Sequence, residues 1–430
     1  MTDEARQPLK GDPTAPEADA PADTPANAPA KGSAKRSLHK REIIADSVIT
    51  VLSEAGISGL THRRAAKAAG ISLSATTYHY ATKADMLADA SQDLLARYLA
   101  SFRRAAREQR EGRGRDASPQ AFVARLLSNT AGRNRRDSVA WCEIILEAAK
   151  SPEGHQLALH WFEELHEAWT DLFAAFGAGH DDADVQIAID TVIGLMFIAL
   201  PLNLTPSEVT EIGTDAWPEM LAALSQDAAP SAKSDQPKGK KAQATRARIV
   251  EGAIKILKQS GVAGMSYRAV AEESGVALTA PAYYFGSIEA LIRVAEAELF
   301  QDSKARYRQI FSVSKMAEPT AETLADLTAA ILVREATEFR LASIAHYSVW
   351  LAATRTESLR PAVASAVLDQ INAWDRRIAP LAVAGPGDGT YLQALFLGQH
   401  IRGLACGSPM AILAKSRGYF LNRLTKPPAS

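Results

Sequence analysis

The sequence predicts an all-α protein that contains one helical unit twice. Apolar residues recur at helical spacing along most of the chain, as in the one-sided stripe from Ile44 to Leu52 that stops at Gly56. Alternating strand-like patterns and hairpin dipeptides are scarce. A shift of 205 positions places the segment from Arg41 to Tyr78 on the segment from Arg246 to Tyr283 without a gap. A repeat of this length indicates a duplicated domain and not a solenoid.

Length, charge and cysteine content narrow the class of protein. The chain has 430 residues and a formal net charge of -1, so any attraction to nucleic acid must be local. Its two cysteines, Cys142 and Cys406, have neither a disulfide-framework nor a metal-site spacing. The most apolar run, Val192 to Leu202, is too short to cross a bilayer, and the N-terminus has no signal-peptide core. We therefore expect a soluble, cytoplasmic protein.

Two stretches, Gly70 to Lys83 and Gly275 to Ile288, concentrate small and hydrogen-bonding residues. In the first copy, Thr61 is predicted to cap a helix that ends at Gly70, and Ser72 to cap a short second helix. Two such helices around a glycine turn have the geometry of a helix-turn-helix, whose second helix enters the major groove of DNA. Small residues there allow close approach, while hydroxyl and aromatic side chains reach bases and phosphates.

The candidate DNA-binding residues follow from this geometry. We expect Tyr78 and Lys83 to contact phosphates, and Thr76 and Thr77 to contact bases. The second copy is less suited to phosphates, because Glu272 and its acidic neighbour replace Lys67 and Ala68 of the first. In the first copy the candidates are Thr61, Arg63, Ser72, Ser74, Thr76, Thr77, Tyr78, His79 and Lys83; in the second they are Ser266, Arg268, Thr279 (as a helix cap ahead of Pro281), Tyr283 and Tyr284.

The run from Thr61 to Leu87 resembles the DNA-binding module of the tetracycline-repressor (TetR) family. It has a Thr-capped helix, an Ala-Ala-Gly turn, then Tyr78, His79 and an aromatic residue, followed by Lys83 and an acid. The resemblance covers the start of each half. It implies a three-helix DNA-binding domain, then a helical domain that binds a small-molecule effector and pairs through its last two helices. It also implies a regulator, most simply a repressor, that its effector releases from an operator.

The repeat and the resemblance together predict the domain order and the pairing. We expect two tandem units in one chain, paired as an intramolecular pseudo-dimer through Val185–Ser225 and Tyr391–Leu424. The chain is then a monomer, and complete pseudo-dimers can associate further. The predicted parts are a disordered tail (1–36), a first DNA-binding domain (37–90), a first effector and pairing domain (91–225), a flexible basic linker (226–243), a second DNA-binding domain (244–292) and a second effector and pairing domain (293–424).

Two functions follow from the differences between the copies. The first is a regulator that reads double-stranded DNA with two unlike modules, and therefore an asymmetric operator. The alternative is a ligand- or partner-binding helical scaffold in which the second module has lost DNA binding. The sequence specifies neither the effector nor the operator.

Other conspicuous side chains give weaker signals. Six residues are candidates for effector binding, with core packing as the alternative for each tryptophan: Trp141, Glu143, Trp169, His346, Tyr347 and Trp350. The spacing of His155, His160 and His166 does not place them on one helical face, so we expect no metal site. The sequence contains no phosphate-binding loop or Ser/His/Asp order, and we expect neither an enzyme nor a cofactor.

Overall fold

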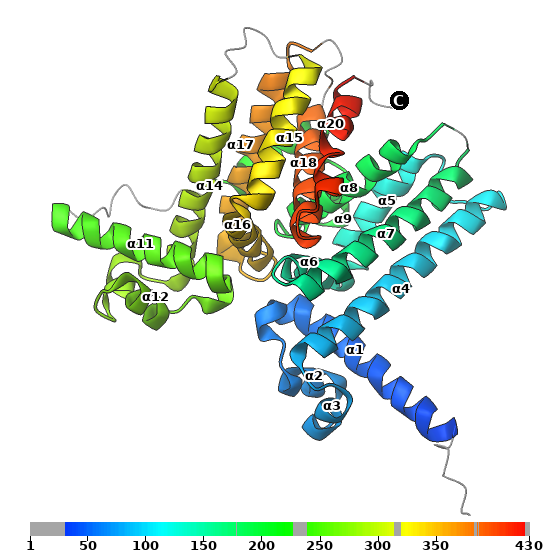
Figure 1. Ribbon diagram of the computed structural model, residues 1–430, viewed down its shortest axis with the longest axis horizontal. Helices are drawn as coiled ribbons and strands as arrows, with labels where there is room; N and C mark the ends of the chain where they lie inside the picture. The colour runs from blue at the N-terminus through cyan, green and yellow to red at the C-terminus, as the bar shows by residue number, and fades with distance from the viewer. Residues whose placement is uncertain are drawn as a thin grey trace, which may run out of the picture. The chain divides into compact units, whose positions relative to one another are not determined.

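The computed structural model describes residues 31–177, 179–226, 239–313, 320–381, 385 and 387–425 (Figure 1). Throughout these ranges the regular secondary structure is helical, without a strand, so the predicted all-α class is confirmed. The chain divides into a unit that ends at Arg41 and a unit that begins at Glu42. All contacts described below lie within the second unit.

The first half contains ten helices, and its helix starts explain most of the boundaries. Thr82 and Asp85 form a reciprocal capping box at one helix start, and Asp181 and Asp184 form another. A serine cap followed by proline starts two more helices. The helices are α1 (Lys31–Gly59), α2 (His62–Ala69), α3 (Leu73–His79), α4 (Lys83–Arg110), α5 (Pro119–Ala131), α6 (Arg135–Ala148), α7 (Pro152–Ala175), α8 (Asp182–Ala199), α9 (Pro206–Val209) and α10 (Ala216–Leu224).

The second half repeats this order, with two added short 3-10 turns. Its elements are α11 (Lys240–Ser260), η1 (Val262–Gly264), α12 (Tyr267–Ser274), α13 (Ala280–Phe285), α14 (Ile288–Val313), α15 (Ala321–Thr337), α16 (Arg340–Ala352), η2 (Glu357–Leu359), α17 (Arg360–Ile378), α18 (Asp388–Ala405), α19 (Met410–Leu413) and α20 (Ser416–Thr425). In both halves two short helices precede a long one, α4 or α14, and the larger helical domain follows.

Three predicted boundaries differ from the structure. Helix α1 begins at Lys31, inside the predicted tail, and α11 begins at Lys240, inside the predicted linker. The rest of the tail and residues 227–238 of the linker lie outside the described residues. The pairing segment Val185–Ser225 was predicted to hold two helices, but after α8 the chain forms two short helices, α9 and α10, with a turn between them. Gly213 in that turn has a φ of 84°, which interrupts a right-handed helix.

The two halves meet most extensively where α8 crosses α18 (Figure 1). Glycines bring the two backbones into direct contact. A methyl group on Gly194 would lie 1.9 Å from the Ala394 carbonyl oxygen, and one on Gly398 would lie 1.7 Å from the Asp190 carbonyl oxygen. The interface predicted from the last two helices of each half, four helices in all, therefore differs from the one in the structure. After the break at Gly213, α10 packs against α17, and α20 packs mainly against α15 of its own half.

A buried ion pair crosses the same interface. Arg402 on α18 donates through Nε and Nη2 to the two carboxylate oxygens of Asp190 on α8, both at 2.8 Å. Gln186 donates a further hydrogen bond of 3.0 Å to Asp190. Burial opposes the charge of Arg402, but the charge and hydrogen bonds of Asp190 outweigh it and raise the pKa of Arg402. Because the pairing is bidentate, it holds the two helices in one register.

Candidate nucleic-acid interface

The first helix-turn-helix has the caps that its sequence predicts. The Thr61 hydroxyl accepts a hydrogen bond of 3.1 Å from the backbone N–H of Arg64 at the start of α2. Gly70 ends α2 in the left-handed conformation, with a φ of 66°. The Ser72 hydroxyl then accepts from the Ala75 N–H at 3.2 Å and starts α3. These local bonds define the turn between the two helices.

One face of α3 is exposed and carries a large aromatic side chain. Tyr78 is 84 % exposed, and Leu73 at the other end of the helix is 47 % exposed. The rings of Tyr78 and His79 meet edge to face with their centroids 5.2 Å apart. Ser74 and Thr77 are exposed on the same short helix. This face therefore offers a phenol and two hydroxyls for contact with DNA.

Thr76, predicted to contact bases, is wholly buried. Its hydroxyl donates to the Leu73 carbonyl at 2.8 Å, within α3 itself. Thr76 lies on the inward face of this helix, so its side chain packs against the domain and does not reach a base edge. This expectation is corrected, whereas the exposed Thr77 remains a candidate for base contact.

Lys83 also differs from its expected orientation. Its ammonium donates to the backbone carbonyl of Ile57 at 2.5 Å, and the side chain is half-buried. Burial lowers the pKa of Lys83. A phosphate contact by Lys83 would require the ammonium to leave Ile57. On α2, by contrast, Arg63 and Lys67 are exposed.

Glu143, predicted to bind an effector, instead connects three segments. Its carboxylate accepts from the Ile57 N–H at 3.1 Å and from Arg355 Nη2, in the second half, at 2.6 Å. The chain passes this site at Gly56, whose φ is 65° and where a methyl group would lie 2.6 Å from the Arg355 guanidinium. A glycine is therefore needed here on both conformational and steric grounds. The ion pair joins the second half to the end of α1.

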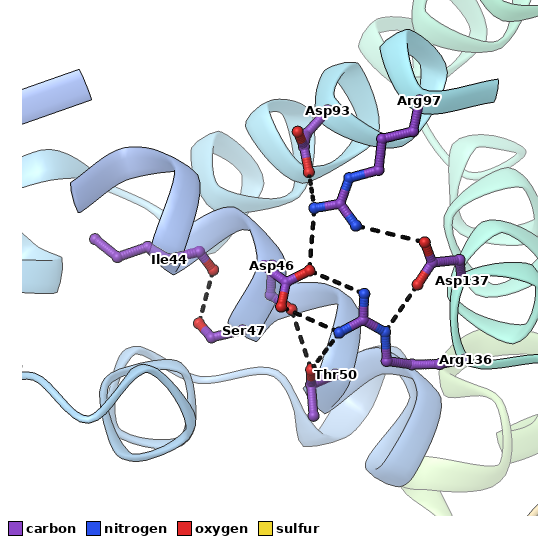
Figure 2. A network of polar contacts seen from close by, with 8 residues as sticks. All are labelled: Ile44, Asp46, Ser47, Thr50, Asp93, Arg97, Arg136 and Asp137. Atoms are coloured by element: carbon purple, nitrogen blue, oxygen red, sulfur yellow. Dashed lines mark hydrogen bonds and ion pairs between the residues drawn. The ribbon is translucent and has the colours of Figure 1, made fainter. Parts of the chain in front are cut away.

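A second polar network holds α1 against α4 and α6 (Figure 2). Asp46 on α1 accepts from Arg136 on α6 at 2.9 Å and from Arg97 on α4 at 3.0 Å. Arg97 also pairs with Asp93, and both arginines pair with Asp137. The hydrogen bond from Arg136 is the main cause that lowers the pKa of Asp46. The network thereby positions α1, which precedes the first helix-turn-helix, on the helical domain of its own half.

The second helix-turn-helix presents the same aromatic face. Ser266 caps α12 by accepting from the Ala269 N–H at 3.1 Å, and Gly275 ends α12 in the left-handed region. On α13, Tyr283 is 84 % exposed, and its ring meets that of Tyr284 edge to face at 5.2 Å. Leu278 is 60 % exposed, at the position that matches Leu73. Both copies therefore present an exposed leucine, an exposed tyrosine and an adjacent ring.

The second copy departs from the first at its helix start and in its charges. Thr279 has helical backbone angles and makes no capping hydrogen bond, so the cap predicted there is wrong. Pro281 does lie in the first turn of α13 and is buried. Arg268 is exposed on α12, but the exposed acids Glu272 and Glu273 follow it. This module offers fewer hydroxyls and less positive charge than the first.

The remaining predicted effector residues occupy two interior regions. Trp141 and Trp169 border an apolar cavity of about 50 Å³ in the first half. In the second half, the Tyr347 hydroxyl and His400 Nδ1 are 2.8 Å apart. Trp350 donates to Glu296 at 3.2 Å, and His346 Nδ1 lies 2.9 Å from the same carboxylate oxygen. His346, Tyr347 and Trp350 form a packed polar cluster and do not line the larger cavity nearby.

That larger cavity, of about 340 Å³, lies between α14, α15, α17 and α18. Sequence analysis missed its polar lining residues Thr328, Gln370 and Arg377. The repeat itself contains the signal that could have identified them. Each occupies a position at which the first half has an aliphatic residue, namely Val123, Leu165 and Leu172.

Comparison with known proteins adds one family match. A family model described as "Tetracyclin repressor-like, C-terminal domain" matches residues 114–226 and, separately, residues 319–425. The two matches together cover just over half of the chain. No curated protein matches the chain. Among the described helices, none combines the length and the apolar character needed to cross a membrane.

Proposed function

Because the chain belongs to the TetR family and contains the family's helical domain twice, we propose that it is a DNA-binding transcriptional regulator. We further propose that it is a repressor and that a small-molecule effector releases it from its operator. The family assignment supports a regulator and not an enzyme.

The observation that carries the proposal is the aromatic face that both modules share. Tyr78 and Tyr283 have the same exposed fraction, and each meets a neighbouring ring at the same distance. A large aromatic side chain left in solvent on a short helix indicates a surface that is covered by a partner. The phenol can donate to a phosphate oxygen while its ring packs on the DNA backbone. The repeated geometry supports docking of both modules.

The contacts between the halves support a monomer with an internal pseudo-dimer. The crossing of α8 and α18 uses direct backbone contact and the buried pair of Asp190 and Arg402. A homodimer would need two chains to form such an interface, whereas this chain forms it alone. One chain therefore presents two modules to one operator.

The unlike modules support an asymmetric operator. Thr77 offers a hydroxyl on α3, whereas Ala282 stands at the matching position of the second copy; Ser74 is matched by Thr279, which also has a hydroxyl. Hydroxyls can read donor and acceptor patterns in the major groove, whereas a methyl group is limited to apolar contact with thymine. We expect two different half-sites about one helical turn apart, with the first read more stringently.

One observation favours the second candidate, a scaffold whose second module does not bind DNA. Glu272 and Glu273 are exposed on α12, at the positions of Lys67 and Ala68. Two carboxylates next to a phosphate backbone repel it. Under this alternative, α13 contributes nothing to DNA affinity.

A binding assay on DNA selected by the full-length chain distinguishes the two functions. Fluorescence anisotropy would compare Tyr78→Ala, Tyr283→Ala and, as a control, replacement by alanine of Met410, which is exposed outside both modules. If both modules read DNA, both tyrosine variants should bind DNA more weakly than the wild type, and the control variant should bind as the wild type does. Loss with Tyr78→Ala alone supports the scaffold alternative, and no selection of DNA by the wild-type chain would refute the regulator.

A further inference from the structure

The cavity in the second half has aromatic walls. Its volume is about 340 Å³, within the usual size of small-molecule sites. Phe300, Phe311 and Trp374 line it, together with Tyr307 and Phe396, whose rings meet edge to face at 6.1 Å. Such walls suit a flat apolar molecule, which can stack on ring faces and edges.

Arg377 supplies a cation at this cavity without a paired carboxylate. Its guanidinium lies 4.1 Å from the Phe311 ring centroid and donates to the Ala373 carbonyl at 2.7 Å. Within the described ranges no acid lies at ion-pair distance from it, and Asp369, whose charge acts on Arg377, is itself paired with Lys304 at 2.5 Å. Burial, and then the neighbouring charge of Arg376, lower the pKa of Arg377. A half-buried guanidinium of this kind is suited to a carboxylate supplied by a ligand.

Uncharged donors face the same space. The Thr328 hydroxyl is buried and has no hydrogen-bond partner in the described chain. Trp374 donates to Gln393 at 3.1 Å, and Gln393 donates to the Gln370 carbonyl oxygen at 2.9 Å. This sequence of bonds leaves the Gln370 NH₂ group available to a ligand. A buried hydroxyl without a partner is costly, so a ligand that satisfies it gains affinity.

The first half has lost this cavity. The corresponding space is the apolar cavity of about 50 Å³ beside Trp169. At the repeat positions of Thr328, Gln370 and Arg377 stand Val123, Leu165 and Leu172. The three substitutions remove every polar group that the second cavity offers at these positions. The first half therefore lacks both the volume and the donors.

A separate cavity of about 240 Å³ in the first half does not replace it. Arg125 lines that cavity, but it makes a bidentate contact with Asp116 at 2.6 to 3.1 Å. The charge of this arginine is already compensated within the protein. An anionic ligand would have to displace Asp116 to pair with Arg125, whereas at Arg377 it displaces no carboxylate. The other arginines that line this cavity, Arg104, Arg115 and Arg133, are exposed to solvent.

We propose that the second-half cavity is the chain's single effector site and that it binds a small planar aromatic molecule with a carboxylate group. Arg377 holds the carboxylate, Thr328 and Gln370 donate further hydrogen bonds, and the aromatic walls enclose the ring. This assignment deepens the proposed function, since it names the effector class and the half that binds it. Binding itself is measured on the free protein, so it is tested separately from DNA release.

The test uses two probes of equal shape, 2-naphthoate and the neutral 2-naphthamide, titrated calorimetrically into the full-length chain without DNA. We expect one site per chain and at least about tenfold tighter binding of the carboxylate, the range of a hydrogen-bonded charge. Arg377→Leu introduces the residue that the first half has at this position, and it should remove the preference for naphthoate while naphthamide binds as before.

Arg417→Leu is the control, because Arg417 is an exposed arginine on α20 of the same half and does not line the cavity. If Arg377→Leu lowers the midpoint of thermal unfolding, the affinities for the two probes are measured on Thr328→Val and Gln370→Leu instead. These variants remove uncharged hydrogen-bond donors from the same cavity. Two sites per chain, equal affinity for the two probes, no binding of either probe, or an unchanged preference in Arg377→Leu would each overturn the proposal. Failure of the wild-type chain to retain DNA would refute the regulator and leave this binding result standing.

Discussion

The two halves of this chain share one fold but differ in two places: the helix-turn-helix at the start of each half and the interior of the larger helical domain. The first half has hydroxyl caps at both helices of its DNA-binding motif, and its interior is filled around Trp169. The second half lacks the cap at Thr279, has acids on α12, and retains a cavity with Arg377 at its wall.

Contacts between the halves connect the helix that carries Arg377 with the first helix-turn-helix. Arg355 lies in the turn between α16 and η2, shortly before α17, the helix that carries Arg377. Through Glu143 it reaches the Ile57 N–H beside the first DNA-binding domain. A change in α17 on effector binding can therefore reach the first module through one ion pair.

Removal of the buried cation between the halves should have the largest effect on stability. Arg402→Met leaves Asp190 fully buried without its counter-ion, which costs about 3–5 kcal/mol of unfolding free energy. The control Arg136→Met removes a partner of the more exposed Asp46 and should cost no more than about 1 kcal/mol. Urea unfolding measures both. Equal losses would mean that the pairing of the halves does not depend on this contact.

Acidification should destabilise the second half through His400, for which the first half has Leu195 at the matching repeat position. Burial lowers the pKa of His400 to about 3, so it is neutral in the folded chain. The unfolded chain takes up this proton below about pH 6.5, and stability therefore falls as the pH drops from 6.5 toward 3. Between pH 7 and pH 4, protonation of His400 in the unfolded chain should lower the free energy of unfolding by about 3 kcal/mol.

Thermal unfolding across this pH range would be compared between the wild type and His400→Gln, which cannot take up the proton. The variant should lose less stability on acidification, whatever its stability at neutral pH. An identical pH dependence in both proteins would show that His400 is protonated in the folded chain as readily as in the unfolded one.

The parts that could be predicted from the sequence are those set by local chemistry. Thr61, Ser72 and Ser266 cap their helices as expected, since an N-cap bond spans only a few residues. The repeat was equally readable, and the duplicated family match agrees with it. The cap predicted at Thr279 is absent because this residue has helical backbone angles, and its hydroxyl makes no hydrogen bond to the start of α13.

The features that could not be predicted depend on partners distant in sequence. Nothing local to Glu143 indicates that Arg355 and Ile57 complete its contacts. Thr76 and Thr77 are adjacent and chemically identical, and only the packing of a short helix decides that the first is buried. The cavity is hard to predict for a related reason: its polar residues Thr328, Gln370 and Arg377 stand out only against the aliphatic residues at the matching repeat positions.

The connection between effector and DNA should depend on Glu143. Glu143→Gln removes the charge that attracts Arg355 but retains an acceptor for the Ile57 N–H. We expect 2-naphthoate to bind the variant as in the wild type, but to lower its DNA affinity several-fold less, consistent with a coupling free energy of about 1–3 kcal/mol. Anisotropy with and without the probe measures this coupling, and the control is Glu147→Gln, a half-buried acid on the same helix that pairs with Lys150. Full coupling in Glu143→Gln would rule out this route between the halves.

The smallest effect should be a difference in salt dependence between two matched arginines. Arg63 and Arg268 occupy the same position on α2 and α12, and both are exposed. Each phosphate contact contributes about 0.9 to the slope of log affinity against log salt concentration, because binding releases condensed counterions. Arg63→Ala should therefore lower the slope by about one. Arg268→Ala should lower it less, because Glu272 lies one turn away on the same helix and already reduces the local positive potential.

Anisotropy titrations between low and physiological salt give both slopes. Equal decreases would mean that the second module holds the DNA backbone as firmly as the first, and the difference between the modules would then be confined to base reading.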